Sequence, residues 1–318
     1  MARDYIGVVP PRLAKIARLD WGIIGVMTSH SLGQALRQRM KGPGIVVVPG
    51  VYDAMSALFA VQAGFSAVFV SGSALAYTRL ARPDVNLLTV SEVADAVARI
   101  REWVDVPILV DADSGHGNAL NVQRTVRLFE RAGAAAVQIE DQLNHKPVSA
   151  LASRPLVSCA EMVGKIKAAL DARLDPSTII SARTDATYTL GADEGLRRAH
   201  AFAEAGADMV FVEGLSDIVM MKRLASELGA RVPLLHNIVD GAGSPVQTAA
   251  EAEALGYAVV LFPGAAVQAA ATGVTAAMKH LKTDGSTAAL RANTFDAKGL
   301  NAALETPAFL ERVKKFAG

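Results

Sequence analysis

Eight short apolar runs, separated by stretches long enough for a helix, constrain the fold of this 318-residue chain more than any other feature. The runs lie at residues 45–48, 67–71, 107–111, 135–140, 178–183, 208–213, 233–237 and 258–262. Parallel strands need crossover connections of this length, and eight β–α units are the number that closes a TIM-type barrel. Four of the helical stretches end in Ala-Gly or Leu-Gly just before a strand, where glycine commonly caps a helix. The sequence therefore predicts an α/β fold, a (β/α)8 TIM-type barrel.

The segments on either side of these units do not fit the repeat. Residues 1–44 mix prolines, basic residues and an apolar patch before a helical pattern at 31–40, so we predict an N-terminal extension that packs on a barrel at 45–264. Residues 265–318 continue in mostly helical patterns, which exceeds what one closing helix needs. We expect these surplus C-terminal helices to mediate oligomerisation, or else to cover one end of the barrel.

Charge and composition narrow the class of function. The net charge is +1 with acidic and basic residues interspersed, so the chain carries no electrostatic footprint for nucleic acid or an acidic membrane surface. The single cysteine, Cys159, excludes an intramolecular disulfide and a thiolate zinc cluster, and no run of about 18 apolar residues occurs. We expect a cytoplasmic protein that acts on a small molecule and binds neither nucleic acid nor membranes.

Two neighbouring strand-like runs end in acidic residues. Asp111 and Asp113 follow the run at 107–111, and Glu140 and Asp141 close the run at 135–140. Ionised carboxylates are costly to desolvate unless a positive charge meets them, and a hard cation such as Mg²⁺ is a common partner. The sequence therefore predicts a divalent-metal site where these two strands end, although acidic residues there can also cap helices or solvate loops.

The other strand ends add groups suited to a small acid. Active sites of (β/α)8 barrels lie at the carboxyl ends of the strands. Besides the four acidic residues of the third and fourth strand ends, the residues expected there are Tyr52 and Asp53, Ser71, Gly72 and Ser73, Arg183, Glu213, and His236 and Asn237. Carboxylates suit a cation, hydroxyls and backbone amides suit an anion, and an arginine suits a carboxylate or phosphonate. This set predicts a site for a small, doubly charged acid.

Four motifs resemble the isocitrate lyase/phosphoenolpyruvate mutase superfamily, over roughly residues 44–264. They are Ser71-Gly72-Ser73, Asp111-Ala-Asp-Ser-Gly-His-Gly-Asn118, Ile139-Glu-Asp-Gln142 and Ala182-Arg-Thr-Asp185. The resemblance implies a barrel, a Mg²⁺ ion for which Mn²⁺ could substitute, and dimers or tetramers that exchange C-terminal helices. It also implies a 2-oxo or 2-hydroxy acid substrate whose C–C or P–C bond is made or broken through a metal-stabilised enolate.

The resemblance also implies individual roles. Asp111 resembles the direct metal ligand, and Asp113, Glu140 and Asp84 resemble the residues that hold metal-bound waters. Arg183 would clamp the substrate carboxylate, and Ser71, Gly72 and Ser73 would receive the carboxylate and carbonyl oxygens. Tyr52 and Asp53 match first-loop positions that contact the substrate, with Tyr52 as a candidate catalytic residue. Asn237 is a further candidate for substrate binding.

The loop after the fourth strand departs from the lyase pattern. In the branch that includes 2-methylisocitrate lyase, this loop resembles Lys-Arg-Cys-Gly-His, and its cysteine is the acid/base. Here the corresponding residues run from Lys146 to Ala150, and Val148 stands at the cysteine position. Valine cannot exchange a proton, so a cleavage that depends on this group needs another donor. His236 is the candidate for that role, with His116 a weaker one.

These observations leave two readings of the chemistry. The leading hypothesis is a Mg²⁺-dependent lyase that acts on a small 2-oxo or 2-hydroxy dicarboxylate, by decarboxylation as with oxaloacetate or by C–C cleavage. The alternative is a P–C bond enzyme: a phosphonomutase, a carboxyvinyl-carboxyphosphonate phosphorylmutase-like enzyme or a phosphonopyruvate hydrolase. Asn144, Lys146 and Ser149 offer side chains related to those of that branch, but with a different spacing. The exact substrate and pathway do not follow from the sequence.

Overall fold

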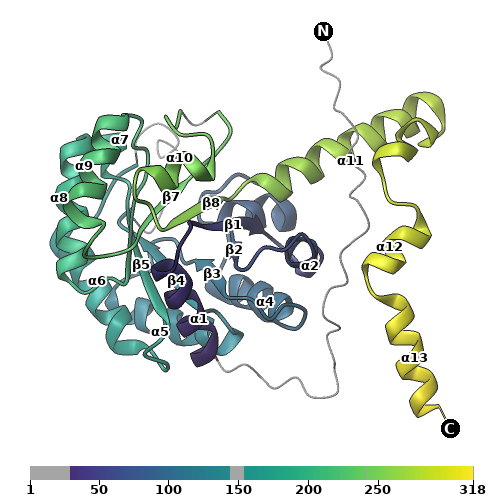
Figure 1. The fold of residues 1–318 in the computed structure, drawn as a ribbon, viewed down its shortest axis with the longest axis horizontal. Helices are drawn as coiled ribbons and strands as arrows, with labels where there is room; N and C mark the ends of the chain where they lie inside the picture. The colour runs from purple at the N-terminus through teal and green to yellow at the C-terminus, as the bar shows by residue number, and fades with distance from the viewer. Residues whose placement is uncertain (1–28, 144–153, 242, 318) are drawn as a thin grey trace. The chain divides into compact units, whose positions relative to one another are not determined.

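The computed structural model describes residues 29–143, 154–241 and 243–317, and it confirms the predicted barrel. Eight parallel strands pair in sequence order, and β1 pairs with β8 to close the sheet (Figure 1). Their bounds are Val46–Val51 (β1), Val68–Val70 (β2), Ile108–Asp111 (β3), Ala136–Glu140 (β4), Ile179–Thr184 (β5), Met209–Val212 (β6), Leu234–Asn237 (β7) and Val259–Phe262 (β8). Each strand lies on one of the eight apolar runs.

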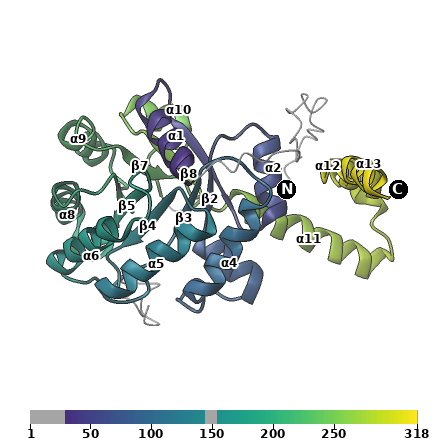
Figure 2. The same ribbon diagram turned by 90° about the horizontal axis from the view of Figure 1, so that it is seen from below.

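Helices connect the strands and surround them, as Figure 2 shows. They are α2 (Ala54–Gln62), α3 (Gly72–Leu75) with the π-helical turn η2 (Ala76–Leu80), α4 (Val90–Arg101), α5 (Ala119–Ala132), α6 (Cys159–Ala172), α7 (Ala186–Leu190), α8 (Ala192–Glu204), α9 (Ile218–Leu228) and α10 (Ala249–Ala254). Gly133 has φ +99° and satisfies the last carbonyls of α5, so its predicted capping role is confirmed.

Two apolar layers hold the barrel together because side chains alternate across each strand. The inner layer fills the barrel with buried residues such as Val48, Phe69, Leu109, Met209 and Leu261. The outer layer lies between strands and helices and contains the opposite residues of the same strands. The barrel interior is therefore a packed core, and only side chains near the strand ends can form a site.

Helix α1 (Ser29–Lys41) covers the amino ends of the strands. Leu36 is completely buried and belongs to the inner apolar layer. Arg37 donates hydrogen bonds to the carbonyls of Ser177 (2.9 Å) and Thr178 (3.2 Å), and it pairs with Asp208 at 2.8 Å. The helix predicted at 31–40 is thus present and packs on the barrel, whereas residues 1–28 of the predicted extension lie outside the described residues.

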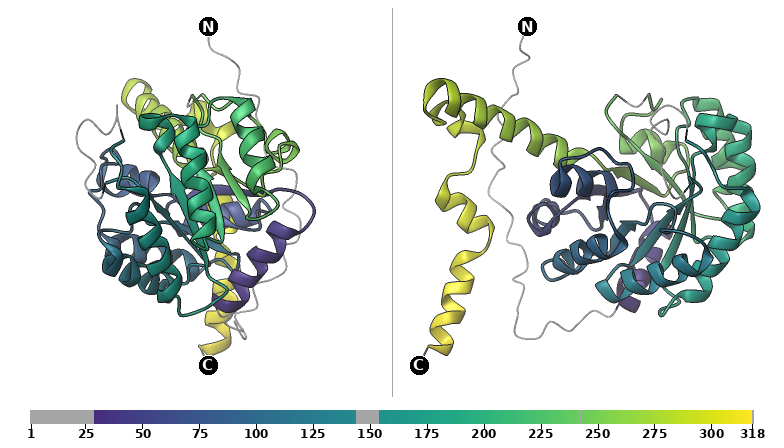
Figure 3. Two further views of the ribbon diagram at one scale, coloured as in Figure 1. Left: turned by 90° about the vertical axis from the view of Figure 1, so that its left-hand side faces the viewer. Right: turned by 180° about the vertical axis from the view of Figure 1, so that it is seen from behind.

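The helices that follow the barrel form a second compact unit, from residue 268 onward. Its elements are most of α11 (Ala265–Asp284), the 3-10 turn η4 (Ala288–Asn293), α12 (Ala297–Ala303) and α13 (Thr306–Phe316), all visible in Figure 3. The helical character predicted for this segment is confirmed. No helix in the described part of the chain is both long enough and apolar enough to span a membrane.

Candidate active site

A cavity of about 360 Å³ opens among the carboxyl ends of the strands. Strands β2 to β8 and the loops that follow them supply its walls, as expected for this fold. Its lining comprises Phe69, Ser71, Ser73, Tyr77, Pro83, Asp84, Val85, Asp111, Gln138, Glu140, Gln142, Arg154, Arg183, Tyr188, Phe211, Glu213, Asn237, Val239, Leu261 and Pro263. Seven of the predicted site residues are brought together here: Ser71, Ser73, Asp84, Asp111, Glu140, Arg183 and Asn237.

Strand alternation explains why these side chains meet. Asp111 continues the inward-facing row of Leu109, and Arg183 and Asn237 continue the inward-facing rows of their own strands. The strands are in register such that Glu140 of β4 lies beside Arg183 of β5. Each polar residue thus lies two or four residues beyond the last apolar side chain of its inward-facing row.

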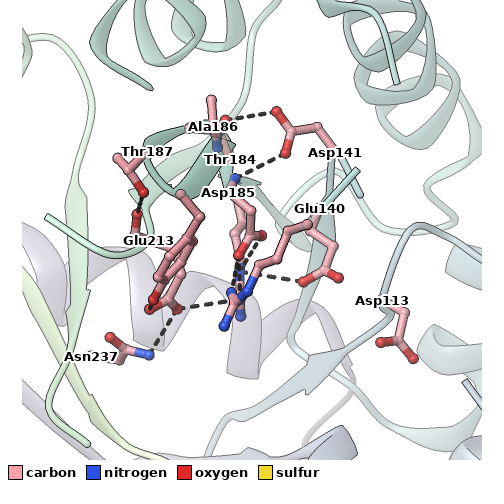
Figure 4. Close-up of polar contacts among 12 residues, drawn as sticks. Asp113, Glu140, Asp141, Thr184, Asp185, Ala186, Thr187, Glu213 and Asn237 are labelled. Carbon is pink, nitrogen blue, oxygen red and sulfur yellow. Dashed lines mark hydrogen bonds and ion pairs between the residues drawn. The ribbon is translucent and has the colours of Figure 1, made fainter. Parts of the chain in front are cut away.

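Arg183 lies at the centre of an ion-pair network whose carboxylates, those of Glu140, Asp185 and Glu213, are labelled in Figure 4. Its guanidinium forms two 2.9 Å hydrogen bonds to Asp185 and pairs at 3.3 Å with both Glu140 and Glu213. Burial alone would lower the pKa of Arg183, but the three carboxylates raise that pKa well above its ordinary value. Arg183 is therefore a permanently charged group with a fixed orientation.

Glu213 extends this network to two further elements. One carboxylate oxygen accepts a 2.9 Å hydrogen bond from Asn237 Nδ2 (Figure 4). The other accepts a 3.2 Å hydrogen bond from the hydroxyl of Tyr188. Burial, reinforced by Glu213, raises the pKa of Tyr188 to about 12. Tyr188 thus remains a neutral phenol whose hydroxyl donates a hydrogen bond to Glu213.

The loop after β3 holds Asp111 and Asp113 in a tight turn. Asp113 has φ +46°, a left-handed conformation that aspartate tolerates better than most residues. Its backbone N–H donates to Asp111 Oδ1 (3.2 Å), and its carbonyl accepts from the N–H of Glu140 at 2.8 Å. A Cβ atom at Gly72 would lie 3.2 Å from Asp111 Oδ2, so glycine at this position gives the carboxylate its room. Figure 4 shows Asp113 and Glu140 on adjacent strand ends.

The oxygen donors in the cavity fit a magnesium ion that binds few protein atoms. No group of three or more His, Cys, Asp or Glu side chains is arranged as a ligand set among the described residues. Mg²⁺ commonly keeps several waters and binds one or two carboxylates plus its substrate. Among the described residues, the lining carries the carboxylates of Asp84, Asp111, Glu140 and Glu213 together with the guanidiniums of Arg154 and Arg183. These carboxylates offer the oxygen ligands that Mg²⁺ prefers.

Several predicted site residues do not line this cavity. Asp53 caps helix α2, where its carboxylate accepts a 2.7 Å hydrogen bond from the N–H of Ser56. Tyr52 is half-buried against the outer apolar layer. Gly72 and Asp113 support Asp111 from outside the lining, and His116 packs edge-on against Phe129. Tyr52 and Asp53 thus make contacts that stabilise the fold, and the geometry adds no support for their predicted contact with substrate.

His236 faces away from the cavity because it precedes the inward-facing Asn237 on β7. Its Nε2–H donates to Ser244 Oγ (2.9 Å), which itself donates to the carbonyl of Val246 (2.8 Å), and its ring packs on Tyr257. Burial lowers the pKa of His236 to about 4. The structure therefore does not bring the predicted proton donor to the cavity, and the roles suggested for 144–149 lie outside the described residues.

Five polar residues of the lining were not singled out as site residues from the sequence: Tyr77, Gln138, Gln142, Arg154 and Tyr188. Glu213 was recognised as a strand end but received no role. Gln138 could have been found from its inward phase two residues before Glu140. Arg154 and Tyr188 follow strands by several residues, so strand periodicity could not place them.

An eight-stranded barrel with carboxylates, hydroxyls and a clamped arginine at the carboxyl ends of its strands defines a barrel enzyme for a small anionic substrate. Residues 36–282 match the phosphoenolpyruvate phosphomutase family, and the chain belongs to this family. The resemblance noted from the four motifs, to the phosphoenolpyruvate mutase/isocitrate lyase superfamily, is thereby confirmed.

Two relatives in sequence are lyases. A 2,3-dimethylmalate lyase from Eubacterium barkeri is 42% identical over 253 residues, which cover 80% of this chain and 87% of that enzyme. A 2-methylisocitrate lyase from Aeropyrum pernix is 43% identical over 231 residues, 73% of each chain. This chain is accordingly an enzyme of the same superfamily.

Solved structures include both chemistries considered above. The crystal structure of 2,3-dimethylmalate lyase matches with a TM-score of 0.83 and 31% identity, covering 90% of this chain and 96% of that one. Oxaloacetate acetylhydrolase in complex with 3,3-difluorooxalacetate matches at 0.83 and 28%, covering 92% and 98%. Phosphonopyruvate hydrolase with oxalate and Mg²⁺ matches at 0.80 and 28%, covering 90% and 99%.

Proposed function

We propose that this protein is a Mg²⁺-dependent carbon–carbon lyase of a small 2-hydroxy or 2-oxo dicarboxylate. The observation that carries the proposal is the meeting of the carboxylates of Asp111 and Glu140, the hydroxyls of Ser71 and Ser73 and the Arg183 guanidinium in one cavity. Carboxylate oxygens suit Mg²⁺, and hydroxyls and a guanidinium suit the oxygens of an acid. The similarity to 2,3-dimethylmalate lyase supports a dicarboxylate substrate, and the similarity to 2-methylisocitrate lyase, whose named substrate is a tricarboxylate, supports C–C cleavage of a 2-hydroxy acid.

The acidic and hydroxyl groups near the ends of β2, β3 and β4 have roles in this proposal. Asp111 would bind Mg²⁺ directly, and Asp84, Asp113 and Glu140 would hold its water molecules; Mn²⁺ could take its place. When bound, the ion acts as a Lewis acid that stabilises negative charge on the oxygen of the 2-oxo acid. Ser71 and Ser73, whose hydroxyls lie 3.0 Å apart, receive substrate oxygens together with the backbone at Gly72.

Arg183 orients the substrate in this scheme. Its guanidinium is fixed by Asp185, Glu140 and Glu213, so it can bind a substrate carboxylate without first losing rotational freedom. Cleavage of a 2-hydroxy dicarboxylate breaks the C2–C3 bond, leaves the electron pair on C3, removes the hydroxyl proton and returns a proton to C3. The products are a 2-oxo acid and a monocarboxylic acid.

A substrate panel tests the proposal. Purified protein with Mg²⁺ is offered 2,3-dimethylmalate, 2-methylisocitrate, oxaloacetate and phosphonopyruvate, and pyruvate, CO₂ and phosphate are measured. We expect pyruvate from at least one of the first three substrates. EDTA and Asp111→Ala should each abolish it, whereas Asp105→Ala, an exposed aspartate before β3, should leave the rate unchanged. Activity that is indifferent to EDTA and to Asp111→Ala would refute the proposal.

The P–C alternative remains open within the same family. A phosphonopyruvate hydrolase and a phosphoenolpyruvate phosphomutase are both among the similar structures. Phosphate released from phosphonopyruvate, or its rearrangement, with no pyruvate formed from the three carbon acids would move this protein to that branch.

We also propose a cytoplasmic homo-oligomer, a dimer or tetramer built through the C-terminal helices. Large apolar side chains of α11 and α13, including Val274, Met278 and Phe316, are exposed in the single chain. Exposed apolar area of this kind commonly marks a protein–protein interface. The single cysteine agrees with a reducing compartment.

A further inference from the structure

Arg154 places a second positive charge in the cavity, although it does not lie at the end of a strand. It lies between β4 and α6, and its side chain lines the cavity. Its Nη1 pairs with Asp185, and its guanidinium stacks 4.0 Å from the centre of the Tyr188 ring. The hydroxyl of Thr189 on α7 donates to the Arg154 carbonyl at 2.8 Å. Ring, carboxylate and backbone contact together fix where this guanidinium lies.

The two cavity arginines differ in how strongly they are already neutralised. Arg183 meets three carboxylates, and its side chain is 14% exposed. Among the described residues, Asp185 is the one carboxylate that forms an ion pair with Arg154, whose side chain is 30% exposed. A guanidinium has five N–H donors, and the ion pair with Asp185 engages the Nη1 end. Arg154 is therefore the cavity cation that is better able to take up an anionic ligand group.

Arg154 lies on the β5 side of the cavity, where it shares Asp185 with Arg183, whereas the hydroxyl and carboxylate groups that would hold the 2-oxo or 2-hydroxy end lie on the β2 and β3 side. Ser71 and Ser73 follow β2, and Asp111 ends β3. Arg154 packs on α7, which follows β5. In an eight-stranded barrel, β2 and β5 are three strands apart, so a ligand that reaches both sides spans the cavity.

We infer that Arg154 binds the second carboxylate of the substrate, the one remote from the 2-oxo or 2-hydroxy group. The inference rests on the proposed function, because it assumes that Asp111, Ser71 and Ser73 engage the other end. In this arrangement Arg154 selects dicarboxylates over monocarboxylates. It is a specificity residue supplied by the chain between β4 and α6, outside the four sequence motifs.

A binding experiment without turnover tests the inference. Isothermal titration calorimetry in Mg²⁺ compares 3,3-difluorooxaloacetate, whose carboxylates are separated by two carbons, with oxalate, whose carboxylates are adjacent. We expect Arg154→Met to weaken binding of the difluoro ligand about 10- to 100-fold and to leave oxalate binding within about twofold. Arg154→Lys keeps the charge but loses the paired N–H donors of the guanidinium, so its affinity for the difluoro ligand should lie between those of the wild type and Arg154→Met.

The controls separate the possible failures. Arg99→Met, which removes an exposed arginine of α4, should bind both ligands as the wild type does. Equal weakening of both ligands by Arg154→Met would show that Arg154 only supports the site, and unchanged binding of both would show that it does not touch the ligand; either result overturns the inference. If the wild type binds neither ligand in Mg²⁺, the proposed function itself fails.

Discussion

Asp141 and Arg198 form a buried ion pair behind the cavity, with Asp141 Oδ2 2.8 Å from Arg198 Nη1. Asp141 also accepts hydrogen bonds from the Thr184 hydroxyl (2.7 Å) and the Asp185 N–H (2.9 Å), contacts that Figure 4 shows. Arg198 in turn donates to the carbonyl of Val157 at 3.0 Å. Since Asp141 follows Glu140 and Thr184 follows Arg183, this pair ties together the two strand ends that carry the central ion pairs.

Breaking this pair should destabilise the fold strongly. Arg198→Met leaves the carboxylate of Asp141 buried without its cation, and such losses cost about 3–5 kcal/mol. We expect a decrease of that size in the free energy of unfolding, measured by urea titration. Arg99→Met removes an exposed pair with Asp95 and should cost less than about 1 kcal/mol. Equal stability of the two variants would contradict the role assigned to Arg198.

Arg183→Lys should impair turnover although it keeps the positive charge. A lysine ammonium cannot make the two parallel hydrogen bonds to Asp185 and still face Glu140 and Glu213. We expect kcat/KM for the active carbon acid to fall by at least about 100-fold. The exposed Arg79→Lys, a matched change on η2, should behave like the wild type. Full activity in the Arg183→Lys variant would show that the paired hydrogen bonds of the guanidinium are not needed.

His236 should make the fold sensitive to mild acid. The pKa of this histidine is lowered by burial from 6.5 to about 4. Between these values the unfolded chain binds the proton and the folded chain does not, so stability is lost as the pH falls from about 6.5 toward 4. From pH 7 to pH 5 the loss from this residue should be about 2 kcal/mol.

His236→Gln should remove this contribution, because glutamine has a donor for Ser244 but does not titrate. The measurement is urea unfolding at pH 7 and pH 5, with His280→Gln on α11 as the control variant. An unchanged difference between the two pH values in the His236→Gln variant would refute the assignment.

The exposed face of α11 should mediate self-association. Val274, Met278 and Leu281 are 61%, 57% and 51% exposed, and their spacing places them on one side of the helix. We expect light scattering after size exclusion to give a dimer or tetramer, and Met278→Glu to shift it toward the monomer. Thr275→Glu adds the same charge at another exposed position and should leave the assembly intact. A monomeric wild type would refute the proposed oligomer.

The sequence predicted the barrel because apolar strands, helix-length gaps and glycine caps are local signals that agree with one another. It also predicted the polar residues that end the inward rows of β3, β4 and β5, which are Asp111, Glu140 and Arg183. The prediction was less successful where a shift of one residue in the inward–outward alternation of a strand decides which side chain faces the cavity. His236 and Asn237 are neighbours at the end of one strand, and only the strand's orientation determines which of them faces the cavity.

Other residues depended on contacts that no local pattern reveals. Asp53 has the sequence signature of a helix cap as much as of a strand-end ligand, and the structure shows the cap. Arg154 belongs to a segment without periodicity, and its place in the cavity follows from Tyr188 and Asp185, which lie more than thirty residues further along. Such residues become visible only when the chain is folded.

The cover that α1 forms over the amino ends of the strands bears on how ligands travel. Because Leu36 and the packed interior close the lower end of the barrel, substrate and products exchange through the mouth between the strand ends. In the proposed cleavage, both fragments would leave through the mouth by which the substrate enters, and we expect the fragment nearer the mouth to leave first. Product inhibition patterns would report that order of release.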